Sequence, residues 1–152
     1  MVVKLLALLL VLGVLAGVLL AVLSWSAKAP PLGLQDGRLR PCPATPNCVR
    51  SERGTAPSGR IDPLRFAGEP GPAWRKAKQA LEAMGGRIVS EQPEYLHAIF
   101  VSRFFRFVDD VELRLDRRAG VIQLRSASRA GHSDLGVNRR RMEALRKRFT
   151  SP

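Results

Sequence analysis

One stretch of the sequence, from position 109 to 139, holds most of the side chains that binding a ligand would require. The candidate ligand-binding residues are Asp109, Asp110, Arg125, Ser126, Ser128, Arg129, Ser133, Asp134, Asn138 and Arg139. Guanidinium groups, hydroxyls and the amino end of a following helix bind small anions in proteins. The same pattern suits a satisfied turn, in which Ser and Asp bond local backbone and Asn138 caps the helix. We favour the turn and keep the anion site as the alternative.

Nucleophilic catalysis by this segment has little support. A Ser/His/Asp triad would need Ser126 or Ser128 together with His132 and Asp134. His132 and Asp134 are too close along the chain to align easily, and no G-x-S-x-G nucleophile elbow occurs. We therefore predict no catalytic residues.

The two cysteines, Cys42 and Cys48, lie six positions apart in a segment bent by two prolines. A disulfide here would close a small loop, stabilise the fold by about 2 kcal/mol and indicate an oxidising compartment. Zinc needs four ligands, and the two histidines, His97 and His132, are isolated. A redox pair would more usually be spaced C-x-x-C. We predict a disulfide, with two free thiols as the alternative, and neither a metal nor a cofactor.

Hydrophobic periodicity predicts the elements that position these residues. A helix is expected over 72–84, where apolar residues recur at helical spacing before two glycines. Strands are expected over 87–91, 95–102, 107–116 and 121–129, and a last helix over 138–149. This order predicts an α+β domain with two layers. It is a roughly four-stranded antiparallel sheet packed by two helices on one face.

The last predicted hairpin is regular enough to give a register. A four-residue loop at 117–120 pairs Leu115 with Ile122 and, further along, Asp109 with Ser128. Asp109 then falls among apolar residues on the covered face, where a carboxylate needs hydrogen-bond donors. We expect Ser128 or the loop after it to supply them.

The other face of this hairpin carries charges of both signs. Glu112 is expected opposite Arg125, and Asp110 lies diagonal to both Arg125 and Arg129. Opposite charges on neighbouring strands stabilise a sheet.

The first residues of the chain form one apolar segment. From Leu5 to Leu23 no polar side chain interrupts the run, which as a helix is about 28 Å long, close to the hydrocarbon thickness of a bilayer. We predict a transmembrane anchor over residues 1–28. A cleaved signal peptide is the alternative, with residues 27–29 (Ala-Lys-Ala) as the cleavage site, although its apolar core would be shorter.

Residues 29–41 are rich in Pro and Gly without periodicity, so a linker is expected before a domain over 42–152. Positive charges on the two sides of the apolar segment nearly balance. The predicted disulfide therefore decides the orientation, and the domain is expected to be periplasmic or otherwise extracytoplasmic.

The chain is strongly basic, with 25 Lys and Arg against 13 Asp and Glu and a formal net charge of +12. This charge favours an anionic lipid or an acidic protein as a partner beside the membrane, although a compositional bias toward arginine explains it as well. Nucleic acid is disfavoured, because the aromatic residues do not interleave with the basic ones. The sequence does not indicate the oligomeric state.

Four motifs in order closely resemble the DUF1499 family over about 42–149. They are Cys42-Pro-x-x-Pro-Asn-Cys48-Val, Tyr95-Leu-His-Ala98, Phe107-Val-Asp-Asp-Val-Glu112, and Arg125-Ser-Ala-Ser-Arg129 through Ser133-Asp-Leu-Gly-Val-Asn-Arg139. The resemblance implies no established activity. It does imply an export signal or membrane anchor before the domain, in bacterial and plastid proteins. The sequence departs from the family pattern at Arg50, because two small hydroxyl residues usually follow Cys-Val in the family.

These observations lead to one hypothesis and one alternative. We expect a membrane-anchored, non-catalytic envelope protein that binds a partner or an anionic ligand near the membrane. The alternative is a small extracytoplasmic, hydrolase-like enzyme that uses Asp109, Asp110 and the loop over 126–134. An open cleft around Asp109 would favour the enzyme, whereas a filled and fully hydrogen-bonded cluster would favour a structural role.

Overall fold

The computed structural model describes residues 2–26, 29–103 and 105–151, so residues 27 and 28 of the expected cleavage site lie outside the described residues. The helices are α1 (Val2–Ser26), α2 (Pro70–Ala83) and α3 (Val137–Thr150), with a short 3-10 helix η1 (Pro57–Gly59). The strands are β1 (Leu34–Gln35), β2 (Arg38–Leu39), β3 (Cys48–Arg50), β4 (Leu64–Arg65), β5 (Arg87–Gln92), β6 (Tyr95–Val101), β7 (Val108–Asp116) and β8 (Val121–Ser128).

The central sheet follows the order β3-β8-β7-β6-β5, and β4 also pairs with β8. Its paired strands are all antiparallel, which confirms the predicted α+β class. The sheet has six strands rather than the roughly four predicted. The additional strands, β3 and β4, are only three and two residues long. Such short strands show no apolar alternation along the chain, and the edge of β8 recruits them by backbone pairing.

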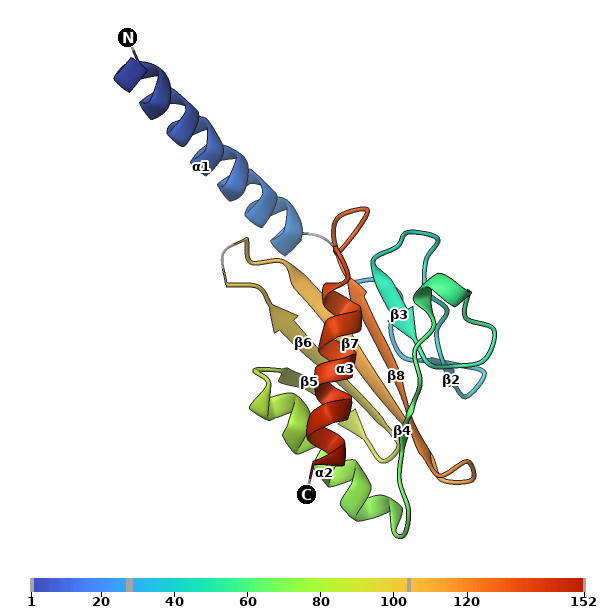
Figure 1. Cartoon of the computed structure of the whole chain (residues 1–152). Helices are drawn as coiled ribbons and strands as arrows, with labels where there is room; N and C mark the ends of the chain where they lie inside the picture. The colour runs from blue at the N-terminus through green and yellow to red at the C-terminus, as the bar shows by residue number, and fades with distance from the viewer. Residues whose placement is uncertain (1, 27–28, 104, 152) are drawn as a thin grey trace.

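The β7–β8 hairpin has the predicted register, with Leu115 opposite Ile122 and Asp109 opposite Ser128. The four-residue turn at 117–120 thus lies at one end of the sheet. The loops after β6 and β8, and the segment that enters β3, lie at the other end (Figure 1). We call this second end the loop end of the domain.

Both α2 and α3 pack on one face of the sheet, as predicted (Figure 1). Their buried side chains share a core with β6, β7 and β8, and the fully buried members include Ala77, Leu81, Leu96, Val111, Leu113, Ile122, Leu124, Met142 and Leu145. The helices are held by their apolar stripes, because side chains three and four positions apart lie on one side of a helix.

The opposite face of the sheet is covered by residues 29–41, which we had expected to be a linker. The β1–β2 hairpin lies here, and the Leu39 side chain is only 1% exposed. The Gly33 N–H donates hydrogen bonds to Glu112 Oε1 (2.8 Å) and to Tyr95 Oη (3.1 Å), and the Leu39 N–H donates to Glu52 Oε1 (3.2 Å). This segment is therefore ordered against the sheet, because its backbone donors satisfy buried acceptors.

Helix α1 is the one helix among the described residues that is long and apolar enough to cross a membrane, a property shared by membrane anchors and signal sequences. Its 25 residues span about 38 Å at the usual helical rise. Figure 1 shows that α1 projects away from the domain, and the span over Val2–Leu19 is not buried.

Candidate functional site

Asp109 lies on the helix-facing side of β7, as predicted, and it is 6% exposed. Its charged partner is Arg141 of α3, which donates from Nη2 to Asp109 Oδ2 at 2.6 Å. We had expected Ser128 or the following loop to supply this donor. The Arg141 guanidinium also donates to Asn138 Oδ1 (2.8 Å) and lies over the Phe100 ring. Asp109 thus belongs to a filled and paired cluster.

Asn138 is buried in the first turn of α3 and does not cap the helix. The N-cap is Gly136, whose φ of 77° lies in the left-handed region that glycine adopts without strain. Asn138 Oδ1 accepts a hydrogen bond from Ser126 Oγ (2.5 Å), and its amide donates to Ser128 Oγ (2.9 Å) and to the carbonyl of Asn47 (3.0 Å). The side chain therefore joins α3 to β8 and to the segment before β3.

The amino end of α3 already binds a carboxylate from its own chain. Asp134 Oδ2 accepts from the N–H of Asn138 (2.7 Å), and Asp134 Oδ1 accepts from the N–H of Gly136 (2.9 Å). Ser133 Oγ accepts from the N–H of Leu135 (3.2 Å). These are the hydrogen bonds of a satisfied turn, and they occupy the donors that the anion site would have used.

Asp110 faces the opposite side of the sheet, where Arg129 binds it through two hydrogen bonds (2.7 and 2.9 Å). His97 Nε2 lies 2.8 Å from Asp110 Oδ1. Burial alone would raise the pKa of Asp110, but the hydrogen bonds with His97 and Arg129 hold this pKa below its usual value. The sequence argument missed His97 in this role, because β6 supplies it from a neighbouring strand.

Glu112 and Arg125 form an ion pair on the same face, in the predicted register. Arg125 Nη1 donates to Glu112 Oε2 at 2.5 Å, and both side chains are essentially inaccessible to solvent. Tyr95 Oη donates to Glu112 Oε1 at 2.8 Å. Burial, followed by the nearby Glu112 carboxylate, raises the pKa of Tyr95. Tyr95 and Glu112 also accept hydrogen bonds from the Gly33 N–H, so they hold the segment after α1 against the sheet.

Asp109, Asp110 and Ser126, which the enzyme hypothesis requires, are buried in the structure. Asp109 and Asp110 are buried in ion pairs on opposite faces of the sheet. Ser126 is inaccessible and bonded to Asn138, whereas His132 is exposed. Within the described ranges, no group of three or more His, Cys, Asp or Glu side chains gathers as metal ligands would.

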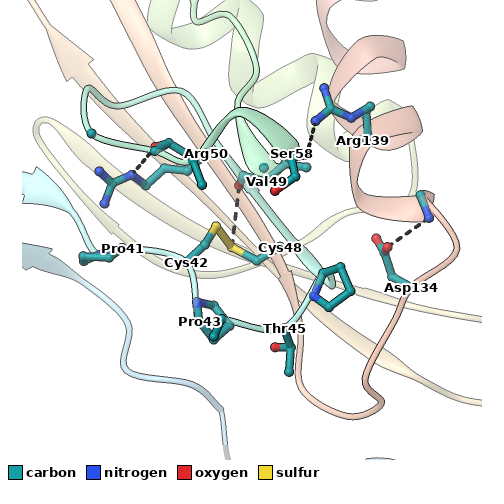
Figure 2. Close-up of a pocket in the computed structure, with 17 residues that line it drawn as sticks. Pro41, Cys42, Pro43, Thr45, Cys48, Val49, Arg50, Ser58, Asp134 and Arg139 are labelled. Carbon is teal, nitrogen blue, oxygen red and sulfur yellow. Dashed lines mark hydrogen bonds between the residues drawn. A yellow bond between two sulfur atoms is a disulfide. The ribbon is translucent and has the colours of Figure 1, made fainter.

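A pocket of about 500 Å³ lies at the loop end of the domain, beside the predicted disulfide between Cys42 and Cys48. The disulfide loop contributes prolines and Thr45, η1 contributes Ser58, and the start of α3 contributes Asp134 and Arg139. Figure 2 shows the disulfide between Arg50 on one side and Asp134 with Arg139 on the other. The pocket therefore has rigid, largely apolar walls with charged groups at its sides.

The arginines at this pocket also organise the surrounding backbone. Arg139 donates to the carbonyls of Ser58 (2.7 Å) and Arg60 (2.9 Å). Arg50 donates to Thr55 Oγ1 (3.0 Å) and to the carbonyls of Leu39 and Arg53. Burial lowers the pKa of Arg50, and the nearby positive charges of Arg125 and Arg38 act in the same direction.

A second, shallower hollow of about 380 Å³ shares Pro41 and Arg50 with this pocket. Arg38 and Arg53 line it, together with Asp36. Arg50 thus lies between two hollows, and both have an excess of positive charge. Nothing in the sequence pattern indicated this, because the lining comes from short strands and loops.

The structure divides the candidate residues among four places. Asp109, Ser126, Ser128 and Asn138 join Arg141 on the helix face; Asp110, Arg125 and Arg129 lie on the opposite face; Asp134 and Arg139 line the pocket; and Ser133 belongs to the turn before α3. They therefore do not form a single site.

Comparison with known proteins gives a match over most of the chain. The model of a family described as "Protein of unknown function (DUF1499)" matches residues 38–149. The matched range begins with β2 and ends in α3. It therefore includes the central sheet, the buried ion pairs of Asp109, Asp110 and Glu112, and the pocket. A search of curated proteins finds no match.

Proposed function

The chain belongs to the DUF1499 family, and we propose that it is a membrane-anchored, non-catalytic envelope protein that binds an anionic ligand close to the membrane. The observation that carries this proposal is the contrast between its buried carboxylates and its pocket. Asp109 and Asp110 are closed off in ion pairs, whereas the pocket beside the disulfide is open and lined by Arg50 and Arg139.

The anchor is supported by α1 and by the segment that follows it. The apolar run is longer than the 7–15 residues typical of a signal-peptide core. The chain after α1 is held against the sheet at Gly33, which keeps the domain near the end of the helix. An anchored domain in this arrangement stays beside the membrane.

The extracytoplasmic side is supported by the disulfide between Cys42 and Cys48. Disulfides persist in oxidising compartments and are rare in the cytosol. An alkylating reagent applied to fresh cells without reductant should leave both cysteines unmodified. Ready labelling of both would contradict the proposed side of the membrane.

An anionic ligand is supported by the charge at the pocket. Arg50 and Arg139 contribute two positive charges, and the one carboxylate there, Asp134, is already bonded to backbone N–H groups. Three other carboxylates, Asp109, Asp110 and Glu112, are buried and paired with arginines of their own. Most of the described Lys and Arg residues are exposed, and the net charge of +12 attracts anions to the surface.

The test is a titration of the full chain in nanodiscs of neutral lipid with two soluble anionic probes, a short-chain phosphatidylglycerol and a Glu-rich peptide. We expect at least one probe to bind, with an affinity that falls as salt is added. Arg139→Gln and Arg53→Gln should each weaken binding several-fold. The matched control, Arg118→Gln, lies in the turn at the far end of the sheet and should leave binding unchanged.

Failure of both probes to bind the unmodified chain would overturn the anionic ligand. Equal weakening by Arg139→Gln at the pocket, by Arg53→Gln at the second hollow and by Arg118→Gln would show that net charge alone attracts the probes. Binding of the peptide without the lipid, or the reverse, would identify the source of the anionic group.

A further inference from the structure

We propose that the loop between β6 and β7, residues 102–107, is a second membrane contact that inserts the Phe105 side chain into an anionic bilayer beside α1. The inference rests on the proposed function, because it requires α1 to remain in the membrane. It adds an interaction surface on a part of the molecule that lines neither hollow described above.

The chain between α1 and the sheet limits how far the domain can lie from the bilayer. Gly33 is hydrogen-bonded to the buried Glu112, and Ser26 is the last residue of α1. The interval from 26 to 33 is seven residues (33 − 26 = 7), which reach at most about 25 Å when fully extended. The first residue of the domain that is bound to the sheet, Gly33, therefore stays within about 25 Å of the end of α1.

The position of α1 indicates which part of the domain faces the bilayer. The β6–β7 loop lies at the loop end, on the side where α1 approaches the domain (Figure 1). A Cβ atom placed on Gly17 would lie 3.7 Å from Phe105 Cε1, so the Phe105 ring lies against the backbone of α1. Gly17 belongs to the apolar run that ends at Leu23, six positions and about 9 Å before that end. A ring beside Gly17 therefore lies against the apolar part of α1, below the membrane surface.

The loop combines aromatic and basic side chains. The Phe105 side chain is 48% exposed, and its ring centroid lies 5.7 Å from that of Phe107. Arg103 and Arg106 alternate with these aromatics, and residues 95–108 include no Asp or Glu. Phe is among the side chains that membrane-surface segments bury in the bilayer, and an anionic leaflet attracts nearby Lys and Arg side chains. An exposed aromatic side chain between two arginines, with no carboxylate nearby in the sequence to repel phosphate, suits an anionic lipid surface.

The backbone of the loop adds one further observation. Arg106 has a φ of 54°, in the left-handed region that non-glycine residues seldom adopt. Such strain is retained where the surrounding structure or a function requires it. Here it lies at the tip that carries Phe105.

The experiment uses the full chain with a single added thiol. The native cysteines are joined in a disulfide, so Phe105→Cys provides one reactive site for an environment-sensitive fluorophore. Arg118→Cys, in the exposed turn at the other end of the sheet, is the matched control. Both proteins are reconstituted in vesicles of phosphatidylcholine with or without phosphatidylglycerol, and co-flotation confirms that α1 is inserted.

We expect the fluorophore at position 105 to shift its emission to the blue and to be quenched by nitroxide-labelled lipid in the anionic vesicles. The probe at position 118 should remain solvent-exposed. Arg103→Glu should reduce the response at position 105, because it reverses one of the charges that meet the lipid phosphates.

The other outcomes separate the two proposals. A protein that floats with the vesicles but keeps a solvent-exposed probe at position 105 overturns the loop contact and leaves the anchor intact. A protein that does not float overturns the anchor, and the loop contact fails with it. A shielded probe that lipid nitroxides do not quench assigns the loop to a protein surface, and an equal response in neutral vesicles excludes a preference for anionic lipid.

Discussion

At the scale of single residues, two adjacent carboxylates have opposite surroundings. Asp109 and Asp110 follow one another in β7, and successive side chains of a strand point to opposite faces. Asp109 is therefore paired with Arg141 under the helices, and Asp110 is paired with Arg129 on the other face. Each carboxylate is buried with an arginine that compensates its charge, which is the arrangement of structural ion pairs.

The first prediction concerns Asp109 and its buried partner. Asp109→Ala leaves Arg141 without its counter-charge, and we expect the free energy of unfolding to fall by about 3 kcal/mol. Asp109→Asn keeps a hydrogen-bond acceptor and should cost about 1 kcal/mol. Urea unfolding of residues 29–152 measures both values, with the exposed Glu82→Ala as the control.

An unchanged unfolding midpoint for Asp109→Ala would mean that the ion pair contributes nothing to the fold. Combining Asp109→Leu with Arg141→Met then checks the pairing itself. The double variant should be more stable than Asp109→Ala, because replacing both charges by apolar groups leaves neither one unpaired.

The second prediction concerns the dependence of stability on pH. Hydrogen bonds hold the pKa values of Asp110 and Asp116 below their usual range in the folded protein. Their contribution to stability is therefore complete above the unfolded value of about 3.9, and it is lost as the pH falls from there through the lower folded values. Urea midpoints measured from about pH 6 to about pH 2 should fall steeply below about pH 4.

Asp110→Asn removes one of these titrating groups and should show a smaller loss of stability on acidification. A loss as large as that of the unmodified domain would contradict the assignment to Asp110. A rise in stability below about pH 4 would contradict the sign of both shifts.

At the scale of elements, the segment after α1 is packed against the sheet and contributes to the fold. Residues 29–41 cover the charged face of the sheet, and Leu39, the second residue of β2, is buried. The segment lacks periodicity because a hairpin with two-residue strands is too short to show one. Its ordering comes instead from backbone donors that reach Glu112 and Glu52.

The third prediction compares two leucines of this hairpin. Leu39→Ala removes a side chain that is 1% exposed and should lower the free energy of unfolding by about 3 kcal/mol. Leu34→Ala removes one that is 39% exposed and should cost less than about 1 kcal/mol. Equal and small effects in urea unfolding of residues 29–152 would return this segment to the role of a flexible linker.

At the scale of the whole molecule, the features with a proposed function gather at the loop end. The disulfide, the pocket and the β6–β7 loop all lie there, and the turns at 93–94 and 117–120 lie at the other end of the sheet (Figure 1). An anchored α1 would hold this loop end toward the bilayer. Anionic headgroups and ligands near the membrane would then meet the basic surface first.

The fourth prediction concerns the anchor itself. Because the apolar run is as long as a bilayer is thick, we expect the mature protein to keep its first residues and to stay with membranes through a carbonate wash. Mass spectrometry of the purified mature chain measures the first point. A mature N-terminus near residue 27 or 30 would show that the segment is cleaved.

The sequence by itself determined the features that depend on neighbours along the chain. The two domain helices, the four long strands and the register of the β7–β8 hairpin were predicted from periodicity and one short loop. The Cys42–Cys48 disulfide was predicted for the same reason, because a separation of only six positions along the chain keeps the two thiols close. Local geometry limits these choices to a few, and the side-chain pattern selects among them.

Only the tertiary structure decided which partners meet across long stretches of chain. Arg141 reaches Asp109 across 32 positions, and Gly33 reaches Glu112 across 79. Arg50 comes to lie between two hollows because β3 joins the edge of β8. Several arginines were equally available for each buried carboxylate, and the sequence pattern could not rank them. The packing of α3 and of the hairpin after α1 on opposite faces of the sheet selected one partner for each, since a buried charge is stable only beside its counter-charge.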